Sequence, residues 1–195
     1  MPSSIQKLPE SFESLRLLIR VPRPGDGIML FEAINESHER LKAWFPWAQE
    51  LTGLDERELF VRQCYCKYLL NEDMPLALFL KETGVLVGGS GLHYRDSHVP
   101  SFEIGYWLRS GYEGKGLMSE AVQAITCFAF EVAGANRVYI RCDMDNLRSQ
   151  AVALRAGYVY EGRMRNSERK ADSGDLTDML FYGMTRSDYE KGNQK

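Results

Sequence analysis

The stretch "SFEIGYWLRSGYEGKGLMSEA", residues 101–121, decides which fold the sequence predicts. It begins with an eight-residue apolar run typical of a strand and ends in the strongest helical pattern of the chain, 116–134. Three glycines lie between them, Gly111, Gly114 and Gly116. A glycine-rich turn at a helix N-terminus presents unpaired backbone N–H groups and the positive end of the helix dipole. The stretch therefore predicts a turn that binds a pyrophosphate.

Two well-known phosphate motifs come close to this turn, and neither fits. A Walker loop needs Gly, four residues and then Gly-Lys-Ser/Thr, but Arg109 stands at the first position and Gly116 replaces the hydroxyl that binds magnesium. A dinucleotide fingerprint needs Gly-x-Gly-x-x-Gly, and Ser119 stands at the third glycine. Such a turn suits a pyrophosphate that is held but not cleaved. The residues taken alone also allow a glycine turn with no ligand.

The rest of the chain alternates strand-like and helical patterns without a repeat or a linker. Strand-like runs are expected at 14–21, 75–84, 85–96, 101–108, 137–143, 158–168 and 177–186, and helices at 27–44, 54–73, 116–134 and 146–157. This order predicts a single domain over residues 1–195, with a core at about 12–187 and flexible ends. Its class is α/β (α+β), with a mixed, mostly antiparallel sheet of about seven strands and about four flanking helices.

Composition narrows the functional class. The net charge is −3, which argues against nucleic-acid binding by bulk electrostatics. No apolar run approaches the roughly 20 residues of a membrane span, and the start "MPSSIQKLPESFES" lacks the apolar core of a signal peptide, so we expect a cytoplasmic protein. The four cysteines lack zinc or redox spacing and the three histidines form no cluster with acidic residues, so no metal site is expected.

The turn "GYEGKG", residues 111–116, resembles the Gln/Arg-x-x-Gly-x-Gly/Ala motif of the GNAT superfamily of acetyl-CoA-dependent N-acetyltransferases, except that Gly111 stands at its first position. Further segments follow in the expected order: "LKAWFPWA", "GLHYRD", "FEIGYWL", "NLRSQAVALRAGYVYEG" and "GDLTDMLFYGM". Together they resemble, over about residues 12–187, the branch that acetylates the N-termini of ribosomal proteins. The resemblance implies the GNAT fold, whose sheet is splayed in the middle, and acetyl-CoA as cosubstrate.

The same resemblance implies which residues hold acetyl-CoA. The pantetheine arm would add to the sheet like an extra strand at Trp107 and Leu108. The pyrophosphate would meet backbone N–H groups of the glycine turn. Asn146 would help to hold pantetheine, although its spacing to Ser149 is also that of a helix N-cap. The implied set is Trp107, Leu108, Glu113, Gly114, Lys115, Gly116, Leu117, Met118, Ser119 and Asn146.

The resemblance also implies direct attack of an amine on the thioester. Ser149 matches the general acid for the departing thiolate, with Tyr158 as the alternative because tyrosine serves elsewhere in the superfamily. Glu168 matches the general base, with Glu103 as the alternative. The expected substrate-binding residues are Trp44, Trp47 and Glu103.

The favoured acceptor is the α-amine of a protein N-terminus. An α-amine with a pKa near 8 is about one-tenth neutral at pH 7, whereas the neutral fraction of a lysine amine is far smaller. A mild base therefore suffices for an enzyme that acts on α-amines. The alternatives are a small amine, such as a polyamine, amino acid or aminoglycoside, and a CoA-binding module without catalysis. Dimers are common in such families, so a homodimer is compatible with the resemblance.

Overall fold

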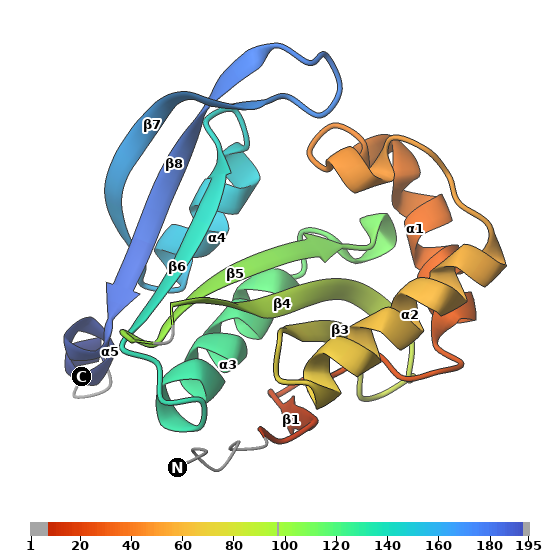
Figure 1. Ribbon diagram of the computed structural model, residues 1–195, viewed down its shortest axis with the longest axis horizontal. Helices are drawn as coiled ribbons and strands as arrows, with labels where there is room; N and C mark the ends of the chain where they lie inside the picture. The colour runs from red at the N-terminus through yellow and green to blue at the C-terminus, as the bar shows by residue number, and fades with distance from the viewer. Residues whose placement is uncertain (1–7, 97, 193–195) are drawn as a thin grey trace.

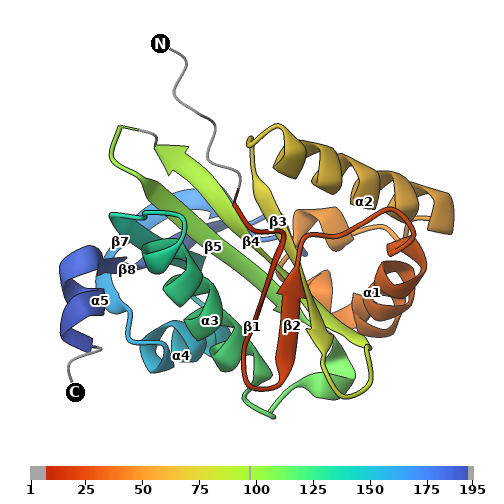
Figure 2. The same ribbon diagram turned by 90° about the horizontal axis from the view of Figure 1, so that it is seen from below.

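In the described part of the chain, eight strands form one mixed sheet in the order β1-β2-β3-β4-β5-β6-β8-β7 (Figures 1 and 2). The computed structural model describes residues 8–96 and 98–192. The strands are β1 Ser11–Glu13, β2 Leu17–Arg20, β3 Met74–Leu80, β4 Leu86–Asp96, β5 Ser101–Leu108, β6 Arg137–Asp143, β7 Val159–Arg169 and β8 Leu176–Thr185. The α-helices are α1 Gly27–Leu41, α2 Leu54–Leu69, α3 Leu117–Glu131, α4 Leu147–Arg155 and α5 Arg186–Gly192, with short 3-10 turns η1 Pro46–Ala48 and η2 Ser110–Tyr112.

Alternation of side chains along the strands gives the sheet two buried faces. On one face Leu78 and Phe102 pack with Ile125 of α3 in the main hydrophobic core. On the other face Phe79 packs with Ala33 of α1 in a smaller cluster. Figure 2 shows α3 and α4 on one side of the sheet and α1 and α2 on the other. The predicted class, a mixed and mostly antiparallel sheet between helices, is confirmed.

The sheet is splayed between its two middle strands. Among the strands of the described residues, β5 with β6 is the one parallel pair, and it extends over Ser101–Glu103 and Arg137–Tyr139. Beyond these residues β5 stays paired with β4, whereas β6 stays paired with β8, so the two strands diverge (Figure 1). We call this region, where Ile104–Leu108 and Ile140–Asp143 are no longer paired with each other, the strand gap, and we call Ile104–Leu108, which pair with β4 but not with β6, the unpaired half of β5. It leaves the backbone groups of one side of β5 without a sheet partner.

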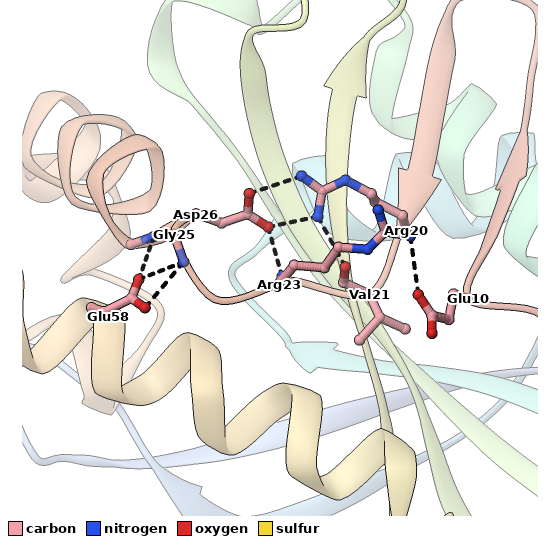
Figure 3. A network of polar contacts seen from close by, with 8 residues as sticks. Glu10, Arg20, Val21, Arg23, Gly25, Asp26 and Glu58 are labelled. Carbon is pink, nitrogen blue, oxygen red and sulfur yellow. Dashed lines mark hydrogen bonds and ion pairs between the residues drawn. The ribbon is translucent and has the colours of Figure 1, made fainter.

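A polar network fixes α1 and α2 to the sheet (Figure 3). Arg20 of β2 donates two hydrogen bonds to the carboxylate of Asp26, at 2.6 and 2.8 Å, just before α1 begins. Glu58 of α2 accepts hydrogen bonds from the backbone N–H groups of Gly25 and Gly27. A Cβ at Gly27 would lie 2.6 Å from the Glu58 backbone, so the close approach of the two helices requires glycine there.

The structure adds two short elements to the predicted ones, β1 and α5. In α5 the ring of Tyr189 stacks on Phe130 of α3 with centroids 4.7 Å apart, and Arg186 donates hydrogen bonds to the carbonyls of Phe130 and Ala135. The packed chain therefore extends past residue 187, where the core was expected to end. The extreme ends, 1–7 and 193–195, lie outside the described residues.

Two further features of the described residues concern membrane spans and metal sites. Within residues 8–96 and 98–192, no helix combines the length and the apolar character that crossing a bilayer requires. The same residues contain no group of three or more metal-ligating side chains.

Candidate active site

The glycine turn between β5 and α3 has the backbone geometry of an anion site. Gly114 and Gly116 have φ values of +73° and +76°, in the left-handed region that favours glycine, and Gly116 is the N-cap of α3. Among the described residues, the N–H groups of Gly114, Lys115 and Gly116 have no hydrogen-bond acceptor. The N–H of Glu113 instead donates to Ser110 at 3.4 Å. The turn thus offers three free donors and the N-terminus of α3, which fits a pyrophosphate.

Arginines from three other elements surround this turn. Arg40 of α1 and Arg148 of α4 both pair with the carboxylate of Glu113. Arg155 of α4 donates to the hydroxyl of Ser119 at 3.2 Å, and Arg16 donates to the carbonyl of Lys115 at 3.0 Å. An acidic protein thereby acquires a local basic surface suited to the phosphates of CoA. Sequence reasoning missed these arginines because only the fold brings them to the turn.

The Lys115 side chain itself turns back onto the loop. Its ammonium group donates to the Gly111 carbonyl at 3.0 Å and lies 5.0 Å from the centroid of the Tyr112 ring. Through these two contacts the Lys115 side chain stabilises the shape of the turn. It also adds a positive charge next to the turn.

Ser149 lies beside the strand gap, at the start of α4. Asn146 caps that helix, because its side-chain oxygen accepts a hydrogen bond from the Ser149 N–H at 3.0 Å. The Ser149 hydroxyl is 2.9 Å from the hydroxyl of Tyr106, a residue of the unpaired half of β5. Burial raises the pKa of Tyr106 well above its ordinary value, although the hydrogen bond with Ser149 opposes this, so the Tyr106 hydroxyl keeps its proton.

Neither Tyr158 nor Cys142 is suited to proton or acyl transfer here. Tyr158 is 2% exposed, and its hydroxyl is bonded to Thr126 of α3 at 2.6 Å. Burial raises the pKa of the Cys142 thiol to about 11, with only a partial offset from a hydrogen bond with Ser149. A thiolate is therefore scarce at neutral pH, which agrees with direct attack rather than a cysteine-linked intermediate.

Arg141 of β6 joins the two carboxylates that were expected to compete as base. Glu103 of β5 accepts from Arg141 at 2.9 Å and from Arg95 at 3.0 Å, and Arg141 also donates to Glu168 of β7 at 2.8 Å. Burial raises the pKa of Glu103, but the hydrogen bonds and charges of Arg141 and Arg95 outweigh it and bring the pKa below its ordinary value. The carboxylate of Glu103 is thus a weak proton acceptor.

The tryptophans lie on the opposite side of β5 from Ser149 and Tyr106. Trp47 of η1 meets Trp107 edge to face, with centroids 6.3 Å apart, and Phe45 packs against Trp47 at 5.2 Å. Trp44 and Trp47 remain 41% and 43% exposed. The Trp107 ring lies flat on β4, since a Cβ at Gly89 would be 2.4 Å from its indole nitrogen. The side chain of Trp107 therefore faces the α1–α2 side of the sheet.

Comparison with known proteins agrees with this geometry. Residues 16–159 match the model of the acetyltransferase (GNAT) domain. The chain is 30% identical over 175 residues to the Bacillus subtilis (strain 168) protein "Putative ribosomal N-acetyltransferase YdaF", covering 89% of this chain and 93% of that one.

Two solved structures share the fold. The microcin C7 self-immunity acetyltransferase MccE, in complex with acetyl-CoA and AMP, superposes with a TM-score of 0.83 at 21% identity, covering 93% of this chain and 99% of that one. RimL, a ribosomal L7/L12 α-N-protein acetyltransferase in complex with coenzyme A, superposes with a TM-score of 0.81 at 24% identity, covering 91% and 97%. With the family model matching most of its length, the chain belongs to the GNAT acetyltransferases and is an acetyl-CoA-dependent N-acetyltransferase.

Proposed function

We propose that this enzyme transfers the acetyl group of acetyl-CoA to the α-amine of a protein N-terminus, of the kind found on ribosomal proteins. The observation that carries the proposal is the likeness to YdaF, which extends over nearly the whole of both chains and whose name refers to ribosomal acetylation. We take the α1–α2 side of β5 as the acceptor side. The exposed tryptophans there support the proposed acceptor, because an extended peptide terminus needs an open apolar surface rather than a closed pocket. A ribosomal acceptor would place the reaction in the cytoplasm.

Ser149 is the proposed general acid. Its hydroxyl lies at the strand gap next to Tyr106, which keeps its own proton and can donate to Ser149 as that residue gives its proton to the departing thiolate. Of the two carboxylates expected as base, Glu168 is the better suited, since it is half exposed and, within the described residues, its carboxylate is bonded only to Arg141, whereas Glu103 is buried and bonded to two arginines and Tyr139.

The cosubstrate would be held at two places. The free donors of Gly114, Lys115 and Gly116, with Leu117, Met118 and Ser119 at the start of α3, would bind the pyrophosphate. The unpaired half of β5 up to Leu108, together with Asn146, would bind the pantetheine arm across the strand gap.

Release of free thiol from acetyl-CoA tests the proposed acceptor. We expect turnover with unmodified peptides that begin with Ser or Ala, and none with the same peptides carrying a blocked N-terminus. Peptides with an internal lysine and a blocked terminus separate α-amines from side-chain amines. Turnover on polyamines or aminoglycosides, with none on the free peptides, would replace the proposed acceptor by a small amine.

A further inference from the structure

A histidine near the strand gap, on the α1–α2 side of the sheet, lies in the segment "GLHYRD" but received no role from the motif or from the family resemblance. His93 is on β4, and the sheet register places it directly opposite Glu103 of β5. Its ring lies flat on the backbone of its own strand, because a Cβ at Gly91 would stand 2.4 Å from Cε1 and 2.5 Å from Nε2 of that ring. A Cβ at Gly105, the partner of Gly91 on β5, would be 3.6 Å from the same Nε2. Nε2 therefore lies over Gly91 of β4 and next to Gly105 of β5.

Asp73 determines which nitrogen of this ring is available. Both carboxylate oxygens of Asp73, in the turn before β3, are 2.9 Å from Nδ1 of His93. A carboxylate can only accept, so Nδ1 carries the proton and donates it, and in the neutral ring Nε2 keeps its lone pair. Within the described part of the chain, Nε2 has no hydrogen-bond partner. The side chains of His93 and Asp73 are 29% and 23% exposed, so the pair is held but accessible.

The position of Nε2 matches what an attacking amine needs. Gly105 belongs to the unpaired half of β5, between Glu103 and Trp107, and alternation directs all three toward the α1–α2 side. Tyr106, which holds Ser149, points to the other side. A thioester in the strand gap would thus meet Ser149 from one face of β5 and an amine over Gly105 from the other. Glycine at 105 leaves that space free of a side chain.

The two carboxylates near this position are less suited to accept the proton. Glu103 and Glu168 share Arg141, and Arg95 adds a second positive charge at Glu103. A proton placed on either carboxylate would weaken an ion pair, whereas a proton on Nε2 would strengthen the existing contact between His93 and Asp73.

We propose that His93, oriented by Asp73, is the general base that takes the proton from the acceptor amine, and that Glu168 instead attracts the amine by its charge. The neutral amine nitrogen attacks the thioester carbon, the C–N bond forms and the C–S bond breaks. The amine proton passes to Nε2 of His93 and the thiolate receives a proton from Ser149. Both side chains then exchange protons with water, and the products are the N-acetylated terminus and free CoA. This inference rests on the proposed function and names a catalytic residue for it.

His93→Gln is the decisive variant, because its amide N–H can still bond Asp73 but cannot take a proton. With a Ser-initiated peptide and acetyl-CoA, we expect kcat to fall by about 100-fold, while the Kd for CoA stays within twofold of that of the unchanged enzyme. His98→Gln, at an exposed position after β4, is the matched control and should keep full activity. A fall in kcat of less than tenfold for His93→Gln would overturn the proposal.

Two further variants separate the role of His93 from those of its neighbours. Asp73→Asn should lower kcat without changing the Kd for CoA, because the wrong nitrogen of His93 then carries the proton. Glu168→Gln should raise the KM for the peptide more than it lowers kcat. A larger loss of kcat for Glu168→Gln than for His93→Gln would return the role of base to Glu168. If the unchanged enzyme acetylates no peptide terminus, the proposed function fails, whereas turnover that His93→Gln leaves intact defeats the inference alone.

Discussion

At the residue scale, the contacts of Ser149 bear most directly on the proposed chemistry. Replacing it with alanine removes the hydroxyl next to Tyr106 but leaves the backbone N–H that Asn146 caps. We therefore expect kcat to fall by about 10- to 100-fold, at the low end for acid catalysis because a thiolate is already a fair leaving group. The Kd for CoA, measured by calorimetry, should change little.

Tyr158→Phe is the matched control for that variant. The Tyr158 hydroxyl is buried against Thr126, so its loss should lower the free energy of unfolding by about 1 kcal/mol and leave kcat unchanged. The reverse pattern, a collapse of kcat with Tyr158→Phe and a normal rate with Ser149→Ala, would transfer the role of acid to Tyr158.

The residues of the proposed site differ in how far the sequence alone could predict them. Gly114, Gly116, Asn146 and Ser149 belong to local motifs; in the structure the glycines lie in the turn before α3, Asn146 caps α4, and Ser149 contacts Tyr106 of β5. Arg141 belongs to no motif, and the segment "GLHYRD" that contains His93 indicates no role for it. They reach the site only because of strand alternation and the exact β4–β5 and β5–β6 registers, which a single sequence does not specify.

At the element scale, the turn before α3 combines a strained backbone with an open space. Gly114 has φ +73° and a Cβ there would meet nothing within 4 Å. Gly84, in the β3–β4 turn, has φ +68° and is equally open, but lies outside the proposed site. Valine at either position should cost a similar 1–2 kcal/mol or so of stability, because both force a branched residue into the left-handed region.

Of the two valine variants, only the change at Gly114 should weaken binding of the cosubstrate. Valine there would stand over backbone N–H groups that are worth roughly 1.5–3 kcal/mol each when they bind a charged group. We expect the Kd for CoA to rise by about 100-fold or more in Gly114→Val and to stay unchanged in Gly84→Val, as measured by calorimetry. Equal affinities in the two variants would mean that the pyrophosphate binds elsewhere.

The elements themselves were largely predictable, and the exceptions have a physical reason. The ranges of β5 and β6 agree with the expected strands, and α3 lies inside the expected helix, because long apolar runs and glycine boundaries specify them. The three-residue β1 and the seven-residue α5 are too short for a periodic pattern. They form through tertiary contacts, such as that of Tyr189 with Phe130.

At the scale of the whole molecule, the residues proposed for the two substrates lie on opposite faces of the splayed sheet. The α3–α4 side holds the glycine turn and Ser149, whereas the α1–α2 side holds Trp47, Trp107 and His93. β5 contributes to both sides at the strand gap, because alternate residues of its unpaired half face in opposite directions. The network of Arg20, Asp26 and Glu58 keeps α1 and α2 in place around the acceptor side (Figure 3).

The stability of the molecule should depend on pH through its ion-paired carboxylates. Hydrogen bonding to Arg137 lowers the pKa of Glu161, and Arg141 and Arg95 lower that of Glu103 despite its burial. A carboxylate whose pKa is lower in the folded state stabilises the protein fully above its unfolded pKa, near 4.5 for glutamate. That contribution is lost as the pH falls through the folded value, so the free energy of unfolding should decrease steadily below about pH 4.5.

Glu103→Gln isolates one part of this dependence. The amide cannot ionise and leaves Arg141 and Arg95 without their buried carboxylate, so the variant should be less stable than the unchanged protein at pH 7. As the pH drops from 4.5 toward 3, the unchanged protein loses the same interaction by protonation, and the difference in stability between the two should shrink. Urea unfolding at pH 7, 5, 4 and 3 measures this difference, with Glu32→Gln at an exposed position of α1 as the control. A difference that stayed constant over that range would mean that the carboxylate of Glu103 keeps its ordinary affinity for protons, and Arg141 could then no longer be credited with holding it ionised at the strand gap.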